Sequence, residues 1–136
     1  MMTVDRDVGR ARVLLEAGAE GGCRAVASVL RGSGDGEVVA LVGELEGLAR
    51  RVGALQVAVM SEIHRRGLHH RDGHSSAKTM VRHLGGLSAG EAGARDRTRR
   101  ALDLLPQLKS AYTAGEVGTD QVRLLGRVPI RGFVTV

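Results

Sequence analysis

The sequence has no tryptophan and no asparagine, and it contains one cysteine, one tyrosine and one phenylalanine. A single cysteine, Cys23, excludes a disulfide bond within the chain and leaves too few thiolates for a cysteine-based structural metal site. We interpret Cys23 as a small, packed apolar residue. The scarcity of aromatic side chains argues against recognition of single-stranded nucleic acid, which depends on base stacking.

Long apolar runs are also missing. No uncharged apolar stretch reaches the length of about 18 residues that a membrane-spanning helix needs. The first ten residues carry Asp5, Arg6, Asp7 and Arg10 and have no apolar segment typical of a signal peptide. We therefore expect no membrane association and a cytoplasmic location.

The apolar residues that are present account for 43% of the 136 residues and are mostly leucine, valine and alanine. This composition favours packed helices over a sandwich or barrel. Twenty glycines, several of them inside helical patterns, predict modest stability. The predicted fold is all-α, with a long helix followed by several short helices that include a helix-turn-helix-like segment.

Residues 1–34 predict two short helical pieces, because apolar residues have helical spacing that Gly18, Gly21 and Gly22 interrupt. A loop follows at Arg31–Gly34. Asp35 is then the predicted N-cap of a long helix that ends near Arg66.

Along this long helix, apolar residues alternate at spacings of three and four, which is the heptad pattern of a coiled coil. We call this stripe the seam; its residues are Val38, Leu41, Leu45, Leu48, Val52, Leu55 and Val59. The seam predicts either a homodimer through these residues or packing onto other helices of the same chain. We favour packing within the chain, because Gly43, Gly47 and Gly53 weaken the helix as an isolated element.

After a predicted turn at LHHRDG, short helices begin at capping residues and end at glycine or proline. Ser75 or Ser76 caps a helix through Leu84, which Gly85-Gly86 stops. Ser88 and Glu91 predict a capping box, in which each side chain accepts from the other residue's backbone amide, for a helix that ends near Leu105. Pro106 closes or kinks that helix, and Thr119 caps the last one.

Several of these motifs occur in an order that resembles a known family. DGHSSAKTMVRHLGGLSAGEA, RALDLLPQL and AGEVGTDQVRLLGRV follow a helix ending in EIHRRGL. This arrangement resembles the actinobacterial domain-of-unknown-function family 222, the 13E12 repeat family, over residues 36–128. The resemblance implies a helical domain with no established catalytic residues, whose longer members often carry a C-terminal HNH endonuclease module. The predicted organisation is an N-terminal segment (1–34), a family domain (35–128) and an irregular tail (129–136).

The tail, within VPIRGFVTV, departs from the helical pattern. A natural irregular terminus would account for it. We favour instead a truncated copy that lacks the HNH module.

The formal charge of +5 is concentrated in one block. Between His64 and Arg100, nine basic and three acidic residues give +6. A basic block is typical of polyanion binding, and equally of a solvated helix face in an arginine-rich protein. If it binds duplex DNA, the expected contacts are Lys78, Arg82, Arg95, Arg97, Arg99 and Arg100.

Nothing in the sequence predicts catalysis. An HNH centre needs an asparagine and metal-binding histidines, and this chain has no asparagine. His64, His69, His70, His74 and His83 are interpreted as exposed turn residues, not metal ligands, and no cofactor is expected. Glycine-rich phosphate loops are absent, and Ser75, Ser76 and Ser88 are helix caps, not nucleophiles.

The functional prediction is therefore a non-catalytic helical domain that acts as a DNA-binding accessory domain. The alternatives are a dimerisation module without a nucleic-acid role and a non-functional fragment. Salt-sensitive DNA binding would support the DNA-binding domain. Helicity that rises with protein concentration would support the dimerisation module.

Overall fold

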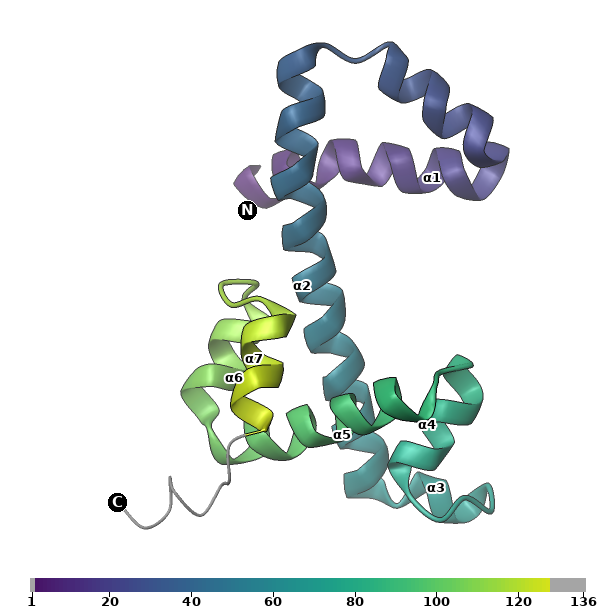
Figure 1. Cartoon of the computed structure of the whole chain (residues 1–136), viewed down its shortest axis with the longest axis vertical. Coiled ribbons are helices and arrows are strands. Elements are labelled where there is room, and N and C mark those ends of the chain that lie inside the picture. Colours follow the sequence, from purple (N-terminus) through teal and green to yellow (C-terminus); the bar gives the residue numbers. More distant parts are fainter. Residues whose placement is uncertain (1, 128–136) are drawn as a thin grey trace. The chain divides into compact units, whose positions relative to one another are not determined.

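The computed structural model describes the backbone of residues 2–127 and the side chains from Gly9 onward. In this range it contains seven α-helices and no strand, which confirms the all-α prediction (Figure 1). The helices are α1 (Met2–Arg31), α2 (Asp35–Arg66), α3 (Leu68–Arg71), α4 (Ala77–Gly85), α5 (Ala89–Leu104), α6 (Pro106–Thr113) and α7 (Thr119–Gly126). The predicted tail, residues 129–136, lies outside the described range. Within residues 2–127, no helix is both long and apolar enough to cross a membrane.

The chain divides into two compact units, Met1–Ala49 and Arg50–Val136. We call them the N-terminal unit and the C-terminal unit. The first half of α2 belongs to the former and its second half to the latter.

The N-terminal unit consists of α1 and the first half of α2. Gly22, with φ 70° and ψ −158°, interrupts α1 and confirms the predicted break between two helical pieces, which are longer than expected. Among the side chains described in this unit, from Gly9 to Ala49, the buried apolar ones are Ala11 and Leu41. Cys23 is exposed, so its interpretation as a packed residue is wrong.

The long helix α2 spans the predicted residues, but its cap is not Asp35. The carbonyl of Gly34 accepts from the amide of Val38 at 3.0 Å, so Gly34 occupies the cap position and Asp35 lies in the first turn. Its carboxylate still interacts favourably with the positive end of the helix dipole there.

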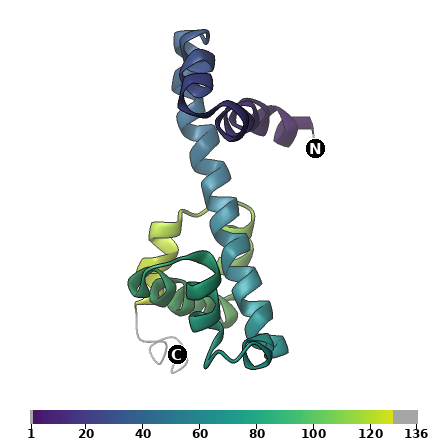
Figure 2. The same ribbon diagram turned by 90° about the vertical axis from the view of Figure 1, so that its right-hand side faces the viewer.

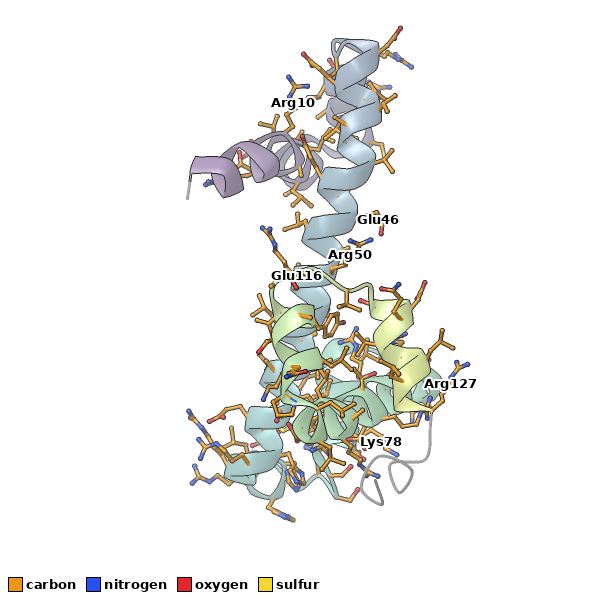
Figure 3. The ribbon with its side chains drawn as sticks, turned by 90° about the vertical axis from the view of Figure 1, so that its left-hand side faces the viewer. Arg10, Glu46, Arg50, Lys78, Glu116 and Arg127 are labelled. Atoms are coloured by element: carbon orange, nitrogen blue, oxygen red, sulfur yellow. The ribbon has the colours of Figure 1, made fainter. Side chains whose placement is uncertain are left out.

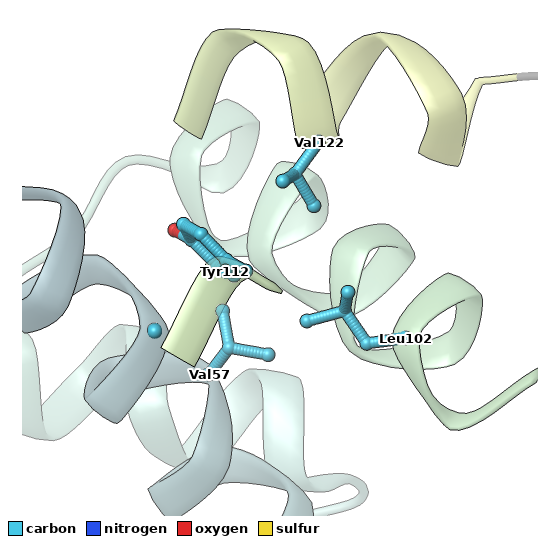
Figure 4. Close-up of a cluster of buried hydrophobic side chains, with 5 residues drawn as sticks. Val57, Leu102, Tyr112 and Val122 are labelled. Carbon is cyan, nitrogen blue, oxygen red and sulfur yellow. The ribbon is translucent and has the colours of Figure 1, made fainter. Parts of the chain in front are cut away.

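In the C-terminal unit, four helices contribute one large side chain each to a common core. Val57 of α2, Leu102 of α5, Tyr112 of α6 and Val122 of α7 meet there (Figure 4), together with Ala54. Helix α5 is the central element, because it packs against α4, α6 and α7 (Figure 1). Figure 2 shows the same arrangement from the side.

The seam does not supply this core. The half of α2 in the C-terminal unit buries Ala54, Val57 and Met60 instead. Val52, Leu55 and Val59 are 44%, 59% and 60% exposed. The favoured prediction, that the seam packs within the chain, is therefore wrong for these three residues.

The short helices end where the sequence predicts. Two details differ from the prediction: an additional helical turn, α3, and the cap of α7. Pro106 ends α5 and occupies the first turn of α6, where its missing amide costs no hydrogen bond. The LHHRDG segment contains one helical turn, α3, before Gly73. The cap of α7 is Gly118, not Thr119, and the side chain of Gln121 accepts from the Gly118 amide at 3.0 Å.

Candidate nucleic-acid interface

The helix-turn-helix-like segment consists of α4, a three-residue turn at Gly86, Leu87 and Ser88, and α5. Ser76 caps α4, since its hydroxyl accepts from the amide of Thr79 at 3.1 Å. Gly86 ends α4 with φ 63°, a conformation that favours glycine, and Leu87 donates to the carbonyl of Arg82 at 2.9 Å. Local sequence signals therefore fix both ends of the turn.

The start of α5 confirms half of the predicted capping box. Ser88 Oγ accepts from the amide of Glu91 at 3.1 Å. The carboxylate of Glu91 does not return to Ser88; it binds Arg95 on the next turn and Arg123 of α7. These two guanidinium groups, Arg123 first, lower the pKa of Glu91.

Helix α5 differs from a DNA-reading helix in how little of it is exposed. A recognition helix presents one face to the major groove. Buried residues instead cover more than half of the circumference of α5: Ala92, Asp96, Thr98, Arg99, Ala101 and Leu102. Its open side is a narrow strip with Arg97, Arg100 and Leu104 at spacings of three and four, and the exposed Asp103 lies at its edge.

The predicted DNA-contacting arginines of α5 fall into two groups. Arg99 has a side chain only 7% exposed and binds Asp96 at 3.0 Å, so it is a structural residue. Arg95, 17% exposed, binds Glu91 at 2.9 Å. Arg97 and Arg100 are exposed, and Arg100 also binds Asp96 at 3.0 Å.

Lys78 and Arg82 lie on the outer face of α4, four residues apart, and both are exposed. Figure 3 shows Lys78 directed away from the core of the C-terminal unit. Among the side chains that the structure describes, Lys78, Arg82 and Arg97 form no ion pair. Of the six predicted contacts, these three are therefore the most accessible to an anion.

Elsewhere in the basic block, Arg65 and Arg66 are already neutralised. Arg65 and Arg66 both bind Glu62, Arg66 at 2.6 Å, and these contacts lower the pKa of Glu62 to about 2. The high density of arginine in the sequence therefore overstates the free positive charge.

The two units nevertheless carry opposite formal charges. From Arg50 to Arg127 there are 14 basic and seven acidic residues, a charge of +7. Residues 2–49 contain five basic and eight acidic residues, a charge of −3. The excess positive charge therefore belongs to the unit that contains the helix-turn-helix-like segment.

The histidines are not all exposed as predicted. His69 is buried, with its ring stacked on that of His64 at 6.3 Å and tilted against that of His70 at 4.1 Å. Burial, together with the neighbouring His70, His64 and His74, lowers the pKa of His69. In the described part of the chain, no three histidine, cysteine or acidic residues are arranged to hold a metal ion.

A small cavity lies in the C-terminal unit beside Arg99 and Tyr112. Its volume is about 20 Å³, room for about one water molecule. A cavity of this size cannot admit a nucleotide or another metabolite.

The family model for "Domain of unknown function (DUF222)" matches residues 39–128. The chain belongs to the DUF222 family. No curated protein and no solved structure matches it. The match covers nearly all of α2 and each helix after it, so the helix-turn-helix-like segment is part of the DUF222 domain.

One feature of this surface has no local sequence signal, namely the ion pair between Arg123 and Glu91. Its partners lie 32 residues apart, and no local pattern joins them. The pair occupies a carboxylate that would otherwise repel an anion at the N-terminus of α5.

Proposed function

We propose that this DUF222 domain is a non-catalytic module that binds the phosphate backbone of duplex DNA through Lys78, Arg82 and Arg97. The observation that carries the proposal is the accessibility of these cations in a unit whose residues 50–127 carry a formal charge of +7. Phosphate contacts position a protein on a duplex without reading its sequence.

The packing of α5 supports contacts to phosphate over contacts to bases. A helix needs an exposed face to enter the major groove. Helix α5 has little exposed surface, because α4, α6 and α7 pack against it. Arg100 belongs to the same open strip as Arg97, but it shares Asp96 with Arg99. We therefore expect weak binding with little preference for sequence.

The test is a salt titration of binding to a labelled duplex, followed by fluorescence anisotropy. Affinity should fall steeply with salt, because each neutralised phosphate releases counterions. Replacing Lys78, Arg82 and Arg97 with glutamine should weaken binding for all sequences. It should also reduce the slope of log K against log salt by about one for each contact removed.

A matched control removes the same charge elsewhere. Arg12, Arg24 and Arg31 are exposed residues of the N-terminal unit, and their replacement with glutamine also subtracts three charges. The control variant should keep the wild-type slope. Equal losses in the two triple variants would mean that net charge alone drives binding, and the proposed surface would be wrong.

A further inference from the structure

Helix α2 has apolar residues on two different faces within the C-terminal unit. One face buries Ala54, Val57 and Met60, which are 5%, 5% and 0% exposed. The other face carries the seam residues Val52, Leu55 and Val59 and is open to solvent. A helix with apolar residues on two faces is normally covered on both, and the second face has no partner among the residues that the structure describes.

We propose that this partner is a second copy of the chain, and that two α2 helices pair in parallel as a short two-stranded coiled coil. The seam residues repeat every 3.5 residues on average, which places them in one stripe along α2. Two such stripes can pack against each other along their length. This proposal is independent of DNA binding.

The residue types along the seam favour a second α2 helix in parallel orientation as its partner. In heptad notation, Val38, Leu45, Val52 and Val59 occupy the a positions, and Leu41, Leu48 and Leu55 occupy the d positions. β-Branched residues at a with leucine at d favour parallel pairs of helices over larger bundles. Three of the four a residues are valine, and all three d residues are leucine.

The flanking positions permit the parallel arrangement. Each g residue there faces the e residue five positions later in the other copy. Glu44 would face Ala49, and Arg51 would face Gln56, so no like charges meet.

Two residues set the limits of pairing. Leu41 is buried within the N-terminal unit and is not available to a second copy. Glu62 is the next d residue after Leu55, and pairing there would bring two carboxylates together. The interface therefore extends from Leu45 to Val59, about two heptads.

The first experiment measures mass by sedimentation equilibrium from about 1 to 200 µM protein without DNA, a range that captures a micromolar dimer. The wild-type chain should show a monomer–dimer equilibrium. Leu55→Glu should raise the dimer dissociation constant at least about thirtyfold, as expected for a central interface residue. Leu124→Glu, at a 61% exposed leucine outside the seam, should leave dimerisation unchanged.

The second experiment determines direction. In a Cys23→Ser background, Leu48→Cys and Leu55→Cys are oxidised separately under mild conditions. Parallel helices bring each cysteine next to its own counterpart, so both variants should form disulfide-linked dimers. In an antiparallel pair, a cysteine can lie next to its own counterpart at no more than one of these two positions. A disulfide-linked dimer from only one of the two variants would therefore overturn the parallel arrangement.

Three results would overturn the proposed dimer. The first is a wild-type chain that stays monomeric throughout the concentration range. The second is a Leu55→Glu variant with unchanged self-association and an unchanged helical spectrum. The third is a chain that dimerises only after residues 128–136 are deleted, which would assign the seam to the chain's own C-terminal segment.

Discussion

Gly53 shows how one missing side chain permits close packing. It lies on α2 where the hydroxyl groups of Tyr112 and Thr119, 3.0 Å apart, approach the helix. A Cβ atom at position 53 would lie 2.6 Å from the Tyr112 oxygen and 3.0 Å from the Thr119 oxygen. Since Tyr112 is fully buried, the surrounding core restricts any shift of its ring.

Gly53→Ala should therefore destabilise the C-terminal unit by about 1–3 kcal/mol, the usual cost of overpacking. Urea unfolding provides the measurement. Gly93→Ala is the control, because a Cβ atom there meets only Arg97 Nη1, at an ordinary 3.5 Å. Alanine has the higher helix propensity, so the control should gain about 0.5–1 kcal/mol. Equal effects at both positions would contradict the close approach.

His69 makes stability depend on pH. Its pKa in the folded protein lies below the ordinary value of 6.5, so the unfolded chain takes up a proton more readily. The free energy of unfolding should therefore decrease as pH falls below 6.5 and towards the folded pKa. His69→Gln should reduce this decrease in urea midpoints measured at about pH 7.5, 6.5 and 5.5.

His83→Gln is the control for this effect. His83 is exposed, and its ring tilts against that of His74 at 5.5 Å. The control should follow the wild-type pH dependence. If it flattens the curve as much as His69→Gln does, the buried ring is not the source of the effect.

The arginines of α5 show the limit of residue-level prediction. Arg97 and Arg99 are two positions apart in a basic stretch, yet one is exposed and the other is buried against Asp96. Spacing assigned both to a DNA surface, because only tertiary packing determines which side of α5 is covered. A variant lacking all four arginines from Arg95 to Arg100 would also lose the buried pair between Arg99 and Asp96, so it would confound DNA binding with stability.

At the scale of the element, capping signals were the most predictable features. Ser76, Gly86 and Ser88 all occupy the predicted boundaries, because a cap depends on atoms within three or four residues. The cap at Asp35 was missed by one residue, and so was the cap at Thr119. Its hydroxyl contacts Tyr112 of α6, and that longer-range partner is invisible to a local pattern.

Ser88→Ala should destabilise the domain by about 0.5–2 kcal/mol, because the amide of Glu91 loses its side-chain acceptor at the start of α5. Denaturant melts provide the measurement. Ser75→Ala is the control: Ser75 Oγ contacts the Thr79 hydroxyl at 3.3 Å, and the Thr79 amide donates to Ser76. A Ser88→Ala variant as stable as the Ser75→Ala variant would mean that the cap contributes nothing.

For the whole molecule, the sequence predicted the helical class, the long α2 and the break in α1. It did not predict which face of α2 enters the core. The seam is the more regular apolar stripe, but the opposing elements select small and flexible residues, Ala54 and Met60, for close packing. Periodicity finds apolar faces, whereas the shapes of the partner helices decide which face is buried.

The purified chain should leave plasmid DNA intact in the presence of Mg²⁺, Mn²⁺ or Zn²⁺, even where it binds the plasmid. The chain lacks asparagine, and the described residues hold no cluster of three metal-binding side chains. Agarose electrophoresis would detect nicking of supercoiled DNA. Metal-dependent nicking that disappears when His70 and His74 are replaced would instead assign a metal site to the turn that contains them.

The burial of Tyr112 has a spectroscopic consequence. Since the chain has no tryptophan and no second tyrosine, this residue is its only strong intrinsic fluorophore. Its emission should change when the core around Val57 and Val122 opens, and the N-terminal unit contributes no comparable signal. Circular dichroism records the helices of both units. A thermal scan followed by both probes can therefore separate their melting without any label, because non-coincident transitions would show that the units unfold independently.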